Sequence, residues 1–195
     1  MLISAREAAR RLEEVGVTRR QTRRLIALGF AGAPVTTPST VLVDEDRVAA
    51  LADRPRLTGA DLDRWFPHGV FVARRDVDLR PPKSPSSPSS PPSRLLEQVR
   101  SGWEFSPYTG VWIRVLAGRH GHVPLVATTC GFVALGADIT GVRAAGDGRY
   151  VLELTAPGDW FAGIGGARLV TARGRPWVLH RGPVDGRETV PTMGD

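Results

Sequence analysis

The chain has 195 residues, of which 42% are hydrophobic and 24% are charged, an ordinary composition for a soluble globular protein. This length allows one large domain or two small ones, each with a core of its own. The formal net charge of +6 favours acidic partners modestly. All but one of the 26 basic residues are arginine, so the positions of the arginines are more informative than their number.

The cysteine count argues against a disulfide-stabilised protein, and the distribution of apolar residues argues against a secreted or membrane-spanning one. Cys130 is the only cysteine, which excludes a disulfide within the chain and favours a reducing compartment. Arg6 and Glu7 interrupt any N-terminal signal sequence, and the longest weakly polar run, 123–137, is shorter than a membrane span. We therefore expect a cytoplasmic protein without membrane contact.

Two short capped helices are predicted at the N-terminus. Ser4 and Glu7 form a capping-box pattern, and apolar residues continue from it at helical spacing: Ala8, Ala9, Leu12 and Val15. A turn containing Gly16 follows. Thr18 and Gln21 repeat the capping-box pattern and begin a second helix at Arg19. This layout is typical of a helix-turn-helix.

The second helix, 19–28, is predicted to have one basic and one apolar side. At about 100° per residue, four arginines share one side: Arg19, Arg20, Arg23 and Arg24. Three residues suited to packing lie roughly opposite: Thr22, Leu25 and Ile26. Gly29 ends the helix. The arginines indicate either an anion-binding face or an ordinary solvated face.

Further elements are predicted up to residue 80. Residues 30–40 are rich in turn formers, 41–43 form a short strand, and Asp44 caps a third helix over 45–52. Thr58 and Asp61 cap a fourth helix that ends with Trp65 and Phe66, which we expect to pack on the first three helices. A strand at 70–72 and a solvated edge of mixed charge at 74–80 complete this part.

Residues Ser4 to Leu57 resemble the small winged helix-turn-helix domains of the excisionase and MerR-like families. The matching positions are Ser4, Arg6, Glu7, Ala8 and Ala9 in the first helix, the turn 16–20, residues 24–26 in the second helix and the segment 43–51 after the wing. The resemblance implies that the second helix enters the major groove and that the wing touches the DNA backbone. The corresponding groove-contacting residues here are Arg19, Arg20, Arg23 and Arg24. Thr18 in the helix and Thr37 and Thr40 in the wing are further candidates for DNA binding, with an ordinary loop role as the alternative for the two wing threonines.

The segment 81–93 contains only proline, serine and one lysine, so it is predicted to be a disordered tether. It divides the chain into an N-terminal DNA-binding domain (1–80) and a C-terminal domain (94–182), with a flexible tail at 183–195. The predicted fold class is α+β, with a small, mostly antiparallel β or α+β domain after the tether.

The C-terminal domain is predicted to begin with a short helix around Leu95, Leu96 and Val99. Alternating apolar residues predict strands at 111–116 and 149–155, and further strands are expected at 123–129, 131–135 and 139–142. Hairpins are expected across 144–148 and across 173–176, and a helical turn at 159–164. The role of this domain is open; it is the expected surface for a protein partner or a second copy of the chain.

The strongest candidates for metal or catalytic chemistry are His120, His122, Cys130 and His180. Their spacing matches no zinc motif, and turn histidines beside a buried thiol explain them better, so no metal or cofactor is expected. A Cys130–His122 nucleophilic pair, oriented by Asp138 or Glu153, is disfavoured because Cys130 lies in an apolar strand context. Residues 163–166 lack the features of a phosphate loop. We expect no enzymatic activity.

The sequence thus favours a nucleoid-associated DNA-binding protein, either a transcriptional regulator or an accessory or architectural factor. Two alternatives remain. The N-terminal arginines could meet an acidic protein surface, which would make the protein an adaptor. The C-terminal domain could sense a ligand, which requires a pocket near His120 or Trp160.

Overall fold

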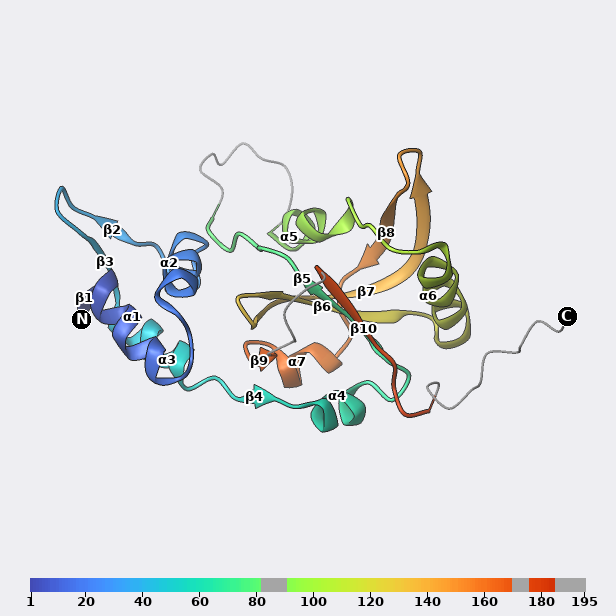
Figure 1. The fold of residues 1–195 in the computed structure, drawn as a ribbon, viewed down its shortest axis with the longest axis horizontal. Coiled ribbons are helices and arrows are strands. Elements are labelled where there is room, and N and C mark those ends of the chain that lie inside the picture. Colours follow the sequence, from blue (N-terminus) through green and yellow to red (C-terminus); the bar gives the residue numbers. More distant parts are fainter. Residues whose placement is uncertain (82–90, 170–175, 185–195) are drawn as a thin grey trace, which may run out of the picture.

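The computed structural model describes residues 1–81, 91–169 and 176–184, with the backbone alone at 91 and 92. These residues form a mixed α+β fold with seven helices and two sheets (Figure 1). We call residues 1–52 the N-terminal module and the described residues from 56 onward the second module. The two modules lie side by side along the long axis of the molecule (Figure 1).

The N-terminal module combines three helices with a three-stranded antiparallel sheet in the order β1-β3-β2. Its elements are β1 (Leu2–Ser4), α1 (Ala5–Glu14), α2 (Arg19–Ala27), β2 (Val35–Thr36), β3 (Val41–Asp44) and α3 (Glu45–Ala52). Their buried side chains form one core, which includes Leu12, Leu25, Val43 and Leu51.

The predicted helix starts are confirmed. The Thr18 hydroxyl accepts a hydrogen bond from the backbone N–H of Gln21, whose side chain accepts one from the Thr18 N–H in return. Asp44 accepts from two backbone N–H groups of α3. The Ser4 hydroxyl caps α1, but the Glu7 carboxylate accepts from Arg10 and Arg11 instead of closing the capping box.

The second module contains a seven-stranded sheet in the order β10-β5-β6-β7-β9-β4, with β8 paired to β7. Its strands are β4 (Arg56–Leu57), β5 (Val70–Arg74), β6 (Val123–Thr129), β7 (Phe132–Ala145), β8 (Arg149–Thr155), β9 (Arg168–Leu169) and β10 (Trp177–His180). The β5–β6 and β4–β9 pairs are parallel and the others antiparallel. The expected hairpin across 144–148 joins β7 and β8.

Helices cover both faces of this sheet (Figure 1). They are α4 (Gly59–Trp65), α5 (Pro91–Arg100), α6 (Pro107–His120) and α7 (Trp160–Ile164). Alternate residues of β5 enter different cores: Phe71 packs with Trp103 and Ile113 on one face, whereas Val72 packs with Phe66 and Ile164 on the other. Because both faces are buried, β5 is continuously apolar from Val70 to Ala73.

The expected boundary at residue 80 does not coincide with a break between the sheets. β5 pairs with β6 and β10, and Leu57 pairs with Leu169, so the chain from 56 to 74 belongs to the second module. Phe66 lies in the core of that module rather than on the first three helices. The proline- and serine-rich segment therefore lies between β5 and α5 of one module. Residues 82–90 of the expected tether and 185–195 of the expected tail lie outside the described residues.

One strand prediction is wrong. Residues 111–116 belong to helix α6, which Ser106 caps and Gly121 ends with a φ of 84°. The buried positions of α6, including Ile113, Leu116 and Ala117, follow helical spacing, although valines at 111 and 115 imitate strand alternation. In the described part of the hairpin expected across 173–176, β9 pairs with β4 and β7 and β10 pairs with β5, so these two strands do not pair with each other. Residues 170–175 lie outside the described residues.

The segment 75–81 joins the two modules rather than forming a solvated edge. Val77 is fully buried, and its N–H donates to the Thr129 hydroxyl at 3.1 Å. The N–H of Leu79 donates to the carbonyl of Leu28, at the end of α2, at 3.0 Å. Phe132 of the second module also joins the two modules, because its side chain packs into the core of the N-terminal module.

Candidate nucleic-acid interface

Helix α2 is held by its apolar side, so its basic side points away from the core of the N-terminal module. Leu25 is fully buried and Ile26 nearly so. Thr22 is also fully buried, and its hydroxyl donates to the Thr18 carbonyl at 3.2 Å, which satisfies this polar group within the first turn. The predicted division of α2 into a packing side and a basic side is therefore present.

All four predicted arginines are exposed, and three of them have no ion-pair partner among the described residues. Arg19, Arg20 and Arg23 are exposed, and none of them forms an ion pair with another described residue. On a helix of 3.6 residues per turn, Arg20 lies near the middle of the exposed face, with Arg23 and Arg19 on the flank away from Arg24. A cluster of unpaired guanidinium groups on one helix face can contact phosphates or guanine bases.

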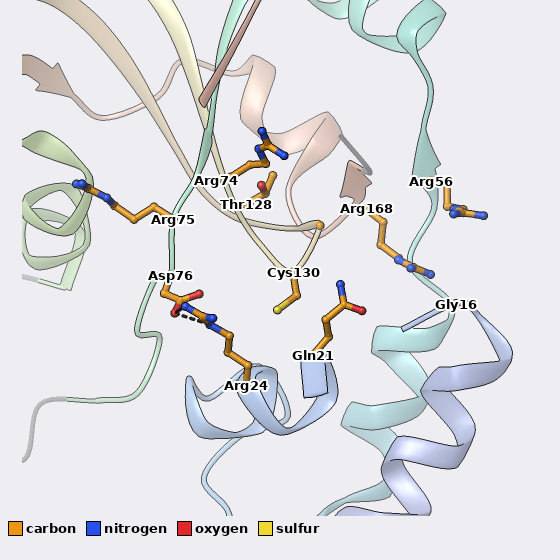
Figure 2. A pocket seen from close by; sticks show the side chains of 11 residues that line it. Gly16, Gln21, Arg24, Arg56, Arg74, Arg75, Asp76, Thr128, Cys130 and Arg168 are labelled. Atoms are coloured by element: carbon orange, nitrogen blue, oxygen red, sulfur yellow. Dashed lines mark hydrogen bonds and ion pairs between the residues drawn. The ribbon is translucent and has the colours of Figure 1, made fainter. Parts of the chain in front are cut away.

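Arg24 differs from the other three because it turns toward the second module. Its guanidinium forms a hydrogen-bonded ion pair with Asp76, which follows β5 (Figure 2). This pair raises the pKa of Arg24 above its ordinary value, chiefly through the hydrogen bond from its side chain to Asp76. The four predicted arginines are thus divided into three without an ion-pair partner among the described residues and one, Arg24, that is exposed but paired.

The β2–β3 hairpin carries the two predicted threonines. The Thr37 hydroxyl accepts from the Thr40 N–H at 3.1 Å and donates to the Thr40 carbonyl at 3.0 Å, and the Thr37 N–H donates to the same carbonyl at 2.9 Å. Thr37 therefore closes the hairpin turn through its own hydroxyl. Thr40 is exposed, and its bonds within the turn use only backbone atoms.

Arg6 adds a basic group that the arginine pattern of α2 did not include. It is exposed near the start of α1 and, with Arg19, borders a shallow surface pocket of about 340 Å³ between the first two helices. Arg10 lines the same pocket but is paired with Glu7 at 2.8 Å and with Glu14 at 3.2 Å. The outer side of α1 thus carries mixed charge, and α2 carries the unpaired positive charge.

Cys130 does not lie with the predicted histidines. His122 lies 3.6 Å from Asp138, and His180 lies 2.7 Å from Asp63. His122 and Cys130 stand at opposite ends of β6, which at about 3.3 Å per residue separates them by about 25 Å. A Cys130–His122 pair is therefore excluded, and the described residues contain no group of three potential metal ligands.

A pocket does lie where the ligand-sensor alternative requires one. It measures about 200 Å³ and is lined by aromatic and imidazole rings, among them Trp65, His68, His120 and Trp160. The rings of His68 and His120 stack with their centroids 3.8 Å apart. The Trp160 indole N–H donates to Asp138 at 2.9 Å, which fixes one wall of the pocket.

Comparisons with protein-family models, with curated proteins and with solved structures find no match to this chain. Among the described residues, no helix has both the length and the apolar character needed to cross a membrane. The functional argument therefore depends on the geometry of the site itself.

Proposed function

We propose that the N-terminal module is a winged helix-turn-helix domain and that the protein binds duplex DNA through it. In this proposal α2 enters the major groove with Arg19, Arg20 and Arg23, while the β2–β3 hairpin is the wing that contacts the backbone. The observation that carries the proposal is the row of three exposed arginines, unpaired among the described residues, on a helix whose opposite side is buried.

The surrounding geometry supports this orientation. α1 and α2 pack against each other through a turn at Gly16, where a φ of 80° allows the chain to reverse. Arg19 and Arg20 in the first turn of α2 are exposed, and the partial positive charge at a helix N-terminus also favours phosphate. The β2–β3 hairpin follows α2 in the chain and projects from the N-terminal module (Figure 1).

Affinity should be modest and dependent on salt. Three phosphate contacts contribute about −2.7 to the slope of log K against log salt concentration, at about −0.9 per contact. A second copy of the protein on the same duplex would raise the apparent affinity through effective concentration. Such a copy, or a protein partner, would contact residues 94–182, where Tyr108, Val111 and Val115 form an exposed apolar stripe on α6.

The test is fluorescence anisotropy with the full chain and a short labelled duplex over a range of salt concentrations. Replacing Arg20 and Arg23 together by alanine should lower affinity at least about tenfold at 0.1 M salt and reduce the slope by about 1.8. The matched control replaces Arg114 and Arg143, two exposed arginines of the second module, and should leave both quantities almost unchanged.

An equal loss of DNA affinity in the Arg20/Arg23 variant and in the Arg114/Arg143 variant would mean that the DNA is bound by nonspecific charge attraction. That result would overturn the proposed role of α2. No binding by the unaltered protein would favour the adaptor alternative, in which the same arginines meet an acidic protein surface. Chromatin mapping of the tagged protein then separates two DNA-binding roles: discrete peaks indicate a regulator, and broad coverage indicates an architectural factor.

A further inference from the structure

A hollow of about 380 Å³ lies between the two modules, beside α2 and at the carboxyl ends of the parallel strands β5 and β6 (Figure 2). We call it the arginine hollow. Gln21 and Arg24 line it from α2, and Arg56, Arg74, Asp76 and Arg168 line it from the second module. Its volume falls in the range of pockets that take small molecules, about 300 to 1,000 Å³.

The charges around the arginine hollow are unbalanced. Its lining contains five arginines and one carboxylate, that of Asp76. This carboxylate is already paired with Arg24. Arg75 turns away from the hollow: its guanidinium lies over the Trp103 ring, 4.4 Å from the centroid, and donates to the Ser101 carbonyl at 2.5 Å. Two further arginines of the lining, Arg56 and Arg168, form no ion pair with a described residue.

Arg168 is the most informative group because it is buried without an acidic partner. Only 4% of this residue is exposed, and it forms no ion pair with any described acid. Its Nη1 donates to the Val15 carbonyl at 2.7 Å, and its guanidinium lies 5.0 Å from the centroid of the Phe132 ring. Its Nε has no hydrogen-bond partner.

A buried donor without an acceptor and a buried cation without a counter-charge both cost free energy. The Phe132 ring compensates part of the charge but offers no hydrogen-bond acceptor to Nε. Burial, with a smaller contribution from nearby Arg56, lowers the pKa of Arg168. An oxyanion in the arginine hollow, which Arg168 lines, would supply the missing counter-charge.

The other groups at this place suit the same ligand. The Gln21 side-chain oxygen accepts from Thr18, which leaves its amide nitrogen available to donate. Arg56 is exposed at the rim of the hollow. Figure 2 shows the Arg168 side chain extending from β9 toward the Gly16 turn. Arginine forks match phosphate oxygens, and a phosphate monoester carries up to two negative charges.

We infer that the arginine hollow binds the phosphate group of a small phosphorylated compound, with Arg168 as its buried anchor. A free compound fits this place better than the backbone of a duplex, because the anchor is recessed and protein groups that contact duplex phosphates are normally accessible at the surface. The bound phosphate would contact α2 and β9 at once and would compete with Asp76 for Arg24. Ligand occupancy would therefore change how the N-terminal module is held.

The test measures thermal unfolding of the full chain with increasing phenyl phosphate and, separately, inorganic pyrophosphate, at constant ionic strength set with sodium chloride. The unaltered protein should show a saturable rise of a few °C in the unfolding midpoint at about tenfold excess over Kd. Malonate is the carboxylate comparison and should give a much smaller rise. Equal stabilisation by malonate would overturn the phosphate assignment.

Two variants test whether the phosphate binds in the arginine hollow. Arg168→Met keeps a long side chain without charge, so it should retain or raise the midpoint in the absence of ligand and should abolish the rise with phenyl phosphate. Arg56→Ala changes an exposed residue and should weaken the response several-fold without affecting folding. Arg114→Ala is the control and should respond as the unaltered protein does.

No saturable rise in the unaltered protein, or the same rise in Arg168→Met, would overturn the inference. If phosphate compounds have no effect while Arg168→Met lowers affinity for duplex DNA as the Arg20 and Arg23 substitutions do, the phosphate comes from the nucleic-acid backbone and the free-ligand assignment fails. These measurements without DNA do not depend on the proposed DNA binding, so either proposal can fail alone.

Discussion

The guanidinium of Arg24 on α2 forms an ion pair with Asp76, the second residue after β5. The pair joins a helix of the N-terminal module to a strand end of the second module, 52 residues away in the sequence. Nearby, the Leu79 N–H donates to the Leu28 carbonyl and holds the end of α2. The side of α2 that carries Arg24 therefore contacts the second module, and the side that carries Arg19 and Arg23 is left for an external partner.

This division leads to a prediction for Asp76→Asn. Loss of the carboxylate charge releases Arg24, so affinity for duplex DNA should increase severalfold and the salt slope should steepen by about 0.9. Anisotropy titrations with the full chain measure both quantities. Arg24→Ala should change DNA binding much less than Arg23→Ala does.

The control for this prediction is Asp78→Asn, which removes the same charge from the same segment but releases Arg80 instead. An equal increase in affinity with Asp78→Asn would show that only the net charge matters. A loss of affinity in Arg24→Ala as large as that in Arg23→Ala would mean that Arg24 leaves Asp76 when DNA binds.

The second prediction separates the two threonines of the hairpin. Thr37→Ala removes the hydroxyl that accepts from the Thr40 N–H, so amide hydrogen exchange at Thr40 should accelerate and DNA affinity should fall a few-fold. Thr40→Ala should leave the exchange unchanged, because the Thr40 hydroxyl is not used in the turn. If Thr40→Ala also lowers affinity, its hydroxyl contacts the DNA directly. Unchanged exchange in Thr37→Ala would contradict the role of its hydroxyl in the turn.

The local features of this fold were predictable from the sequence. The caps at Ser4, Thr18, Asp44 and Thr58 depend on residues within three positions of one another, and each is present. Strand alternation misled the prediction at α6, because Val111 and Val115 are exposed apolar residues on a helix. The Ser106–Pro107 pair, a cap followed by a proline in the first turn, was the signal that could have identified this helix.

The nonlocal features were not predictable in the same way. β5 and β6 are parallel neighbours separated in the chain by α5 and α6, and no local pattern specifies that pairing. The direction of Arg24 depends on the same docking, since Asp76 follows β5. Arg168 belongs to a two-residue strand, and its burial depends on contacts with Val15 and Phe132 from distant parts of the sequence.

The third prediction concerns acid unfolding. Hydrogen bonds from Arg10 and then Arg11 hold the pKa of Glu7 at about 2, below its ordinary value of 4.5. Because the folded state favours the ionised carboxylate, its stabilising contribution is present above about pH 4.5 and is lost as the pH falls toward 2. The unfolding midpoint of the unaltered protein should therefore fall more over this interval than that of Glu7→Gln.

The matched control for the acid prediction is Glu13→Gln on the same helix, because the Glu13 carboxylate makes no ion pair with a described residue. This variant should follow the pH dependence of the unaltered protein. A pH profile of Glu7→Gln that is identical to that of the unaltered protein would contradict the assigned role of the Glu7 pairs.

The fourth prediction concerns the turn between β6 and β7. Cys130 and Gly131 form a two-residue loop between the paired residues Thr129 and Phe132, and their φ angles are 52° and 85°. Two positive φ values in a two-residue hairpin loop are typical of a type I′ turn, which prefers Asn-Gly. Cysteine has no side-chain group that favours this left-handed conformation, which costs a non-glycine residue about 1 to 2 kcal/mol.

Replacing Cys130 by asparagine should therefore raise the free energy of unfolding by about 1 kcal/mol, because asparagine tolerates the left-handed conformation better. Urea unfolding of the full chain measures the change as a higher midpoint at an unchanged slope. Cys130→Val is the opposing control: its branched Cβ makes positive φ more costly, so the midpoint should fall. If asparagine and valine shift the midpoint in the same direction, loss of the thiol rather than backbone conformation determines stability at this turn. Burial raises the pKa of the Cys130 thiol, so thiol reactivity does not interfere with the comparison at neutral pH.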